Sequence, residues 1–173
     1  MRSFLVLMVM WLSIQAWSAS WIGQPAGDFH LLDQVGTWHD LKDYRGQWLL
    51  LYFYPKDGTQ GCTQEAERFR DLYPMFRSRH VNIIGISEDT QVSHADFAHA
   101  LQLPFAILAD AHGEVAKHYG VLNNLLVTRF ASRQSFLINP EGIIVQQYKR
   151  VDPSTHATQV LKDLAVLQGK SNP

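Results

Sequence analysis

The sequence contains very little cysteine and no excess of charge. Cys62 is the only thiol among 173 residues, so the chain cannot form an intramolecular disulfide. Lys and Arg number 15 against 16 Asp and Glu, which gives no electrostatic case for binding nucleic acid or an anionic membrane. A glycine-rich phosphate loop, an Asn-x-Ser/Thr sequon and internal repeats are also missing. With 46% hydrophobic residues, the chain suits one globular domain with a full core.

The first twenty residues have the order of a secretory signal peptide. Arg2 gives a positive start, residues 4–14 are apolar apart from Ser13, and small residues then gather at 16–20. An uncleaved membrane anchor is the alternative, but the apolar run is shorter than the roughly 20 residues that a spanning helix needs. We expect cleavage between residues 18 and 20. The mature domain, residues 21–173, should then be periplasmic or otherwise exported, with no stable membrane association.

Cys62 lies where a strand-to-helix loop ends. The apolar run 48–54 predicts a buried strand, and helix formers with apolar residues at helical spacing follow from Thr63. The first turn of a helix has free backbone N–H groups and the positive end of the dipole, both of which favour a thiolate. A lone cysteine can also be a small buried hydrophobe. However, a free thiol in an oxidising compartment is a liability unless it has a use, which favours a nucleophile.

The remaining pattern alternates strands with helices. An N-terminal β-hairpin, a βαβ unit with a further helix, and a closing ββα unit predict an α/β fold with a central mixed sheet flanked by helices, in the order of the thioredoxin fold. Pro74 should kink or break the first helix, and Gly120 should cap a short one. Predicted strands span 29–33, 37–41, 48–54, 81–87, 105–108, 134–138 and 143–148. Predicted helices span 63–76, 93–101 and 112–119, and a last helix, capped by Asp152-Pro153, contains Val160, Leu164 and Leu167 at helical spacing.

Motifs along residues 21–168 resemble the peroxiredoxins, and the bacterioferritin-comigratory-protein (PrxQ-like) subfamily most closely. The most specific is Pro55-x-x-x-Thr59-x-x-Cys62 together with Arg133 before Ser-Phe-Leu-Ile. Further matching segments are 23–29, 41–46, 52–57, 65–66, 69–71, 85–87, 103–105, 119–121 and 133–138.

The resemblance implies a role for five residues. Cys62 matches the peroxidatic cysteine, Thr59 the threonine whose hydroxyl contacts cysteine and peroxide, and Pro55 the proline that shields the thiolate. Arg133 matches the arginine that holds the thiolate and polarises the peroxide, and Glu65 the acid that orients this arginine. A low thiol pKa weakens nucleophilicity, so rate must also come from aligning the O–O bond and stabilising the leaving oxygen.

Two positions depart from the subfamily pattern. Glu67 replaces the resolving cysteine that many members carry five positions after the first, and Gln60 replaces the usual proline. The resemblance therefore implies a one-cysteine peroxidase for hydrogen peroxide and organic hydroperoxides, reduced by an external thiol or a thioredoxin-like protein. Thiol–disulfide exchange and a non-catalytic binding module are the alternatives. We expect no cofactor, no metal site among the eight histidines, and a monomer or weak homodimer.

Overall fold

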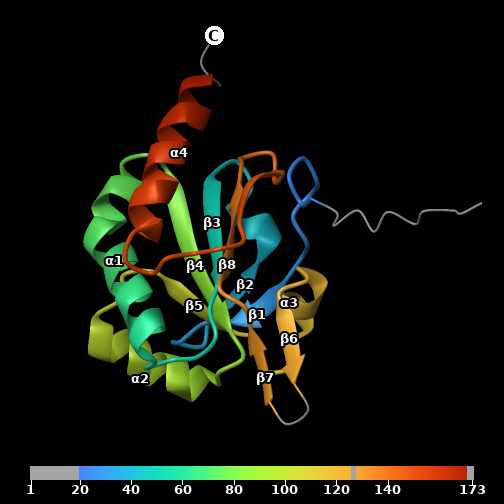
Figure 1. The fold of residues 1–173 in the computed structure, drawn as a ribbon, viewed down its shortest axis with the longest axis vertical. Helices are drawn as coiled ribbons and strands as arrows, with labels where there is room; N and C mark the ends of the chain where they lie inside the picture. Colours follow the sequence, from blue (N-terminus) through green and yellow to red (C-terminus); the bar gives the residue numbers. More distant parts are fainter. Residues whose placement is uncertain (1–19, 126–127, 171–173) are drawn as a thin grey trace, which may run out of the picture.

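The computed structural model describes residues 20–125 and 128–170. The predicted signal peptide lies outside these residues except for Ser20. At the centre of the fold is a five-stranded mixed sheet with the order β5-β4-β3-β8-β9 (Figure 1). Its strands are β3 (Trp48–Phe53), β4 (Val81–Ser87), β5 (Ala106–Ala109), β8 (Gln134–Ile138) and β9 (Ile144–Tyr148).

The direction of pairing changes at β3. β3, β4 and β5 are parallel, whereas β8 is antiparallel to both β3 and β9. Parallel neighbours need crossover connections, which α1 (Gln60–Arg77) and α2 (Gln91–Leu101) supply. In the ladder Phe53 pairs with Ile86 on one side and with Gln134 on the other. The last residue of β3 and the first residue of β8 therefore lie side by side, at the end of the sheet from which the chain continues toward Cys62.

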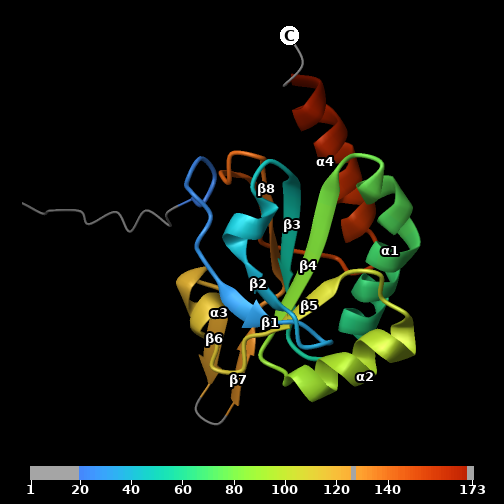
Figure 2. The same ribbon diagram turned by 180° about the vertical axis from the view of Figure 1, so that it is seen from behind.

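Two layers cover the sheet on opposite faces, because successive side chains of a strand point in opposite directions. Leu50 and Tyr52 of β3 pack with α1, α2 and α4 (His156–Lys170), whereas Leu51 and Phe53 pack with α3 (Glu114–His118) and the N-terminal segment. Figures 1 and 2 show α1 and α4 on one side of the sheet and α3 on the other. Within the described residues, no helix is both long and apolar enough to span a membrane.

The predicted central mixed sheet and N-terminal hairpin are present, the latter as β1 (His30–Leu32) and β2 (Trp38–Asp40), followed by the 3-10 helix η1 (Leu41–Tyr44). The predicted cap at Gly120 is confirmed by its positive φ of 66°. Of the predicted kink or break at Pro74, the break was wrong, because α1 continues to Arg77. Pro74 lies in the last turn of the helix, so its missing N–H removes a single bond near the end.

One hairpin has no counterpart in the sequence-based assignment. It consists of β6 (Leu122–Leu125) and β7 (Thr128–Ala131), which pair antiparallel in a separate two-stranded sheet. Leu122 and Ala131 join the apolar layer that contains α3, and the rest of the hairpin is more exposed. Asn123 and Asn124 interrupt any alternation of apolar and polar residues, which explains why this segment did not read as a strand.

Candidate active site

Cys62 lies in the first turn of α1, as predicted, and it is free and buried, with only 2% of its surface exposed. Thr59 is the N-cap residue of the helix, with an extended backbone. The backbone N–H groups of a helical first turn have no acceptor within the helix, so this turn favours a negative charge. The thiol is therefore held at a position that stabilises a thiolate while most water is excluded.

Arg133 reaches this thiol from the opposite part of the chain. It immediately precedes β8, whose antiparallel pairing with β3 brings it beside the loop that leads to α1. Its Nη2 donates a hydrogen bond to Sγ of Cys62 at 3.2 Å. Gly61 leaves room for this approach, since a Cβ there would lie 3.1 Å from the same nitrogen. Sheet register thus joins residues that are 71 positions apart.

Glu65 holds the other side of the guanidinium. It lies one turn after Cys62 on α1, is 1% exposed, and accepts a hydrogen bond through Oε2 from Nη1 of Arg133. Burial raises the pKa of Glu65 to about 7, although Arg133 opposes this shift. Burial would lower the pKa of Arg133, but Glu65 and Cys62 outweigh it and raise that pKa. Arg133 therefore stays charged, with one nitrogen for each partner.

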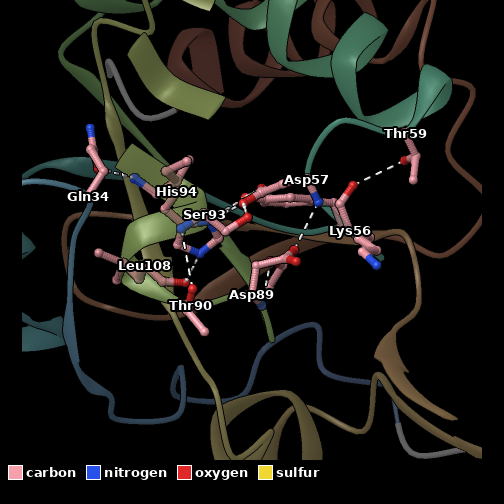
Figure 3. Close-up of polar contacts among 12 residues, drawn as sticks. Gln34, Lys56, Asp57, Thr59, Asp89, Thr90, Ser93, His94 and Leu108 are labelled. Carbon is pink, nitrogen blue, oxygen red and sulfur yellow. Dashed lines mark hydrogen bonds and ion pairs between the residues drawn. The ribbon is translucent and has the colours of Figure 1, made fainter. Parts of the chain in front are cut away.

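Thr59 and Pro55 lie on the loop between β3 and α1. The hydroxyl of Thr59 donates to the carbonyl of Lys56 at 3.1 Å, at the exposed edge of the site (Figure 3). Pro55 is half-buried and lines a cavity of about 540 Å³ between this loop and the β6–β7 hairpin. The structure thus brings Cys62, Glu65 and Arg133 into direct contact, and it places Pro55 and Thr59 on the flanking loop.

Two further residues interact with the site, and the sequence assigned neither of them a role in it. Tyr52 of β3 is fully buried, and its pKa is raised well above the ordinary value by burial, with Glu65 and Cys62 adding to the shift. His156, the first residue of α4, bonds through Nε2 to the hydroxyl of Ser135 at 2.9 Å. Burial, together with the charge of Arg133, lowers the pKa of His156 to about 4, so it is neutral. Neither Tyr52 nor His156 belongs to the sequence motif that contains Cys62, so nothing in the sequence indicated that they lie near it.

This arrangement suits the chemistry of a nucleophilic sulfur. A guanidinium 3.2 Å from Sγ stabilises a thiolate and also any negative charge that develops on an atom bonded to the sulfur. Arg presents its donors in a rigid fork, so the bond to Glu65 fixes the direction of the donor toward Cys62. No group of three or more His, Cys, Asp or Glu side chains that could hold a metal ion occurs in the described part of the chain.

Comparisons with known proteins agree with this site. Residues 22–147 match the AhpC/TSA family. Peroxiredoxin Bcp of Bacillus subtilis is 38% identical over 153 residues, which cover 83% of this chain and 96% of the relative. Among solved structures, a variant of Xylella fastidiosa PrxQ has a TM-score of 0.80 at 31% identity, covering 85% of this chain and 96% of that one.

A third relative is the Xanthomonas campestris bacterioferritin comigratory protein, whose structure was described in terms of its alkyl peroxide reduction activity. It has a TM-score of 0.76 at 32% identity, over 80% of this chain and 90% of its own. These structural matches confirm the predicted thioredoxin-like fold class, and the sequence matches confirm the predicted resemblance. The chain therefore belongs to the AhpC/TSA family and is a peroxiredoxin of the Bcp and Q type, a class of thiol-dependent peroxidases.

Proposed function

We propose that this chain reduces hydrogen peroxide and organic hydroperoxides with Cys62 as the nucleophile and an external thiol as the reductant. The contact of Arg133 with Sγ at 3.2 Å, in the first turn of α1, is the observation that carries the proposal. The alkyl peroxide reduction named for the Xanthomonas campestris relative supports the inclusion of organic hydroperoxides.

The first step is a displacement on oxygen. The thiolate of Cys62 attacks one peroxide oxygen, an S–O bond forms, and the O–O bond breaks with both electrons passing to the leaving oxygen. That oxygen takes a proton to become an alcohol, or water when the substrate is hydrogen peroxide. Sulfur is oxidised by two electrons to a sulfenic acid, and the peroxide is reduced by two. Arg133 donates to the sulfur and to the leaving oxygen as charge moves between them.

The other site residues position the reactants. We assign Glu65 the orientation of Arg133, because its carboxylate binds the nitrogen that faces away from the sulfur. We assign the hydroxyl of Thr59 a contact with the peroxide. Its proton is donated to Lys56, and its oxygen keeps lone pairs that can accept from a peroxide O–H. Pro55 forms the half-buried wall that limits access of water to the thiolate.

The second half of the cycle requires another molecule. Glu67 stands at the position where a resolving thiol would lie, and the chain has no other cysteine. A small thiol or a thioredoxin-like protein attacks the sulfenic sulfur, releasing water and leaving a mixed disulfide. A second thiol then restores Cys62. Without a reductant, further peroxide should oxidise the sulfur to an inactive sulfinic acid.

We also propose that the mature domain is exported, most simply to a bacterial periplasm. Arg2, the apolar residues 4–14 and the small residues before Trp21 support this proposal. N-terminal sequencing of the exported protein should begin between Ala19 and Trp21. Recovery of an intact Met1 in a membrane fraction would favour an anchor instead.

Peroxide consumption with dithiothreitol as reductant tests the proposed activity. Wild-type protein should consume hydrogen peroxide and cumene hydroperoxide, whereas Cys62→Ser should not, because a hydroxyl is not deprotonated near neutral pH. Insulin reduction, assayed beside it, separates the peroxidase from a thiol–disulfide exchange protein. A wild type that is inactive toward both peroxides and toward insulin would leave the non-catalytic alternative.

A further inference from the structure

A buried Asp–His pair links the loop before Cys62 to α2, the helix that follows β4. Asp57 belongs to the loop between β3 and α1, and His94 lies on α2. Nδ1 of His94 is 2.8 Å from Oδ2 of Asp57, and the two side chains are 0% and 6% exposed (Figure 3). Burial of this kind excludes the water that weakens pairs at the surface.

Both carboxylate oxygens of Asp57 and its backbone N–H have hydrogen-bond partners outside the loop or beside it. Its Oδ1 accepts from the hydroxyl of Tyr54 at 2.8 Å, and its Oδ2 accepts from the hydroxyl of Ser93 at 2.7 Å. Its backbone N–H donates to Oδ2 of Asp89 at 2.9 Å. Tyr54 directly follows β3, Asp89 lies just after β4, and Ser93 and His94 belong to α2. One loop residue is thus tied to three elements.

The two ring nitrogens of His94 have different partners. Nε2 lies 3.1 Å from the carbonyl oxygen of Leu108, which can only accept. Nδ1 faces the carboxylate of Asp57. Burial raises the pKa of Asp57, but hydrogen bonds from His94, Ser93 and Tyr54 outweigh it and lower that pKa below its ordinary value. Both ring nitrogens of His94 therefore face acceptors, and each is placed to donate a hydrogen bond. Asp57 and Tyr54 are the titratable groups that contact it.

The same loop leads directly into the first turn of α1, which carries Cys62. Cys62 is only 2% exposed, so in this conformation the sulfur is shielded from an external thiol. We propose that Asp57 and His94 form a latch that holds this loop closed, positions Thr59 and the start of α1, and limits access of the external reductant to Cys62. The part that concerns the reductant rests on the proposed function, whereas the latch itself does not.

Alkylation of reduced Cys62 by iodoacetamide measures loop opening without any peroxide. His94→Gln and Asp57→Asn should accelerate alkylation by about ten-fold or more, since a buried charge-assisted hydrogen bond accounts for at least this factor. Hydrogen exchange of the peptide covering residues 55–62 should accelerate with it. His30→Gln is the matched control, because it removes an exposed His–Asp pair with Asp40 and should change neither rate.

The alkylation rates are compared across the pH range in which the thiol titrates. An opened loop raises the rate at every pH, whereas a changed thiol acidity only shifts the profile. Nitrogen NMR of the His94 ring adds a signature that a purely structural role would not produce: both nitrogens protonated in the wild type, one in Asp57→Asn. If His94→Gln does not fold, Asp57→Asn, which keeps the shape of the side chain, serves alone.

Unchanged alkylation and exchange in a folded latch variant, or a neutral His94 ring in the wild type at neutral pH, would overturn the proposal. With peroxide and thiol present, the latch variants should form less sulfinic acid than wild type at equal peroxide turnover. A wild-type protein without peroxidase activity, but with the expected alkylation rates, would refute the proposed function and leave the latch standing.

Discussion

The pair of Arg133 and Glu65 makes a prediction about stability that depends on pH in a defined way. Arg133→Ala leaves the carboxyl of Glu65 buried, with only 1% of the residue exposed, and without its cation. Breaking a buried ion pair costs about 3–5 kcal/mol when the remaining charge has no relief. Here relief exists, because Glu65 can take a proton. The cost of the substitution should therefore depend on pH.

The sign follows from the pKa of Glu65, which burial raises from 4.5 to about 7. A raised folded-state pKa gives stability that is present below the unfolded value and lost as pH rises through the folded value. In wild type the stability that Glu65 contributes is therefore lost between about pH 4.5 and pH 7. Removing Arg133 removes the contributions that lower the pKa, so in the variant the loss continues at higher pH. The difference between the two proteins should grow by up to about 1.4 kcal/mol per pH unit above pH 7.

Urea unfolding at a series of pH values measures this difference. Both proteins carry Cys62→Ser, so that the thiol does not titrate. At about pH 5.5 Arg133→Ala should cost roughly 1 kcal/mol, the value of a neutral hydrogen bond, and by about pH 8.5 some 2 kcal/mol more. Adding Glu65→Gln to both proteins should make the difference between their free energies of unfolding independent of pH over this range. A difference that stays constant from pH 6 to 8.5 (roughly the range over which Glu65 titrates) would refute the assignment of Glu65 as the titrating partner.

Three further substitutions test other parts of the site. Arg133→Lys keeps the charge but offers one nitrogen where two bind, so the stopped-flow rate constant with peroxide should fall about 10²-fold; an unchanged rate would exclude the forked contact. Glu67→Cys restores a second thiol, but five helical residues rise about 7.5 Å along the axis, too far for a disulfide. Its disulfide with Cys62 should form only with unwinding of the first turn, seen as reduced helicity upon oxidation. Gly85→Ala places a Cβ 2.8 Å from the Tyr52 ring, and unfolding should show a loss of about 1–3 kcal/mol.

The local sequence pattern was sufficient to predict the position of site residues that lie together on one helix. Cys62, Glu65 and Phe69 recur at helical spacing, and all three are buried on α1. The apolar run that became β3 fixed the position of the loop, so the first-turn location of the cysteine followed from neighbouring residues. The prediction of a break at Pro74 failed because the energetic cost of a proline in a helix depends on how many turns follow it. The sequence pattern did not show that α1 ends only three residues later, at Arg77.

Contacts that cross the fold could not be read from periodicity. The approach of Arg133 depends on the register of β8 against β3, and its role came only from the resemblance to peroxiredoxins. Asp57 and His94 are 37 positions apart, and a polar pair between a loop and a helix leaves no periodic signal. α1 begins at Gln60, three residues before the predicted start, which places Thr59 at its N-cap. The partner of the Thr59 hydroxyl could not be predicted either, because a hydroxyl rotates to whichever acceptor the loop provides.

Intact-mass analysis of the reduced protein after one equivalent of hydrogen peroxide tests the central claim most directly. The one-cysteine mechanism predicts the addition of a single oxygen atom to wild type and no change in Cys62→Ser. Addition of a small thiol should then convert the oxidised protein to a mixed disulfide and, with excess thiol, back to the starting mass. A wild-type protein that gains no oxygen, or a Cys62→Ser variant that gains the same oxygen, would contradict Cys62 as the site of peroxide reduction.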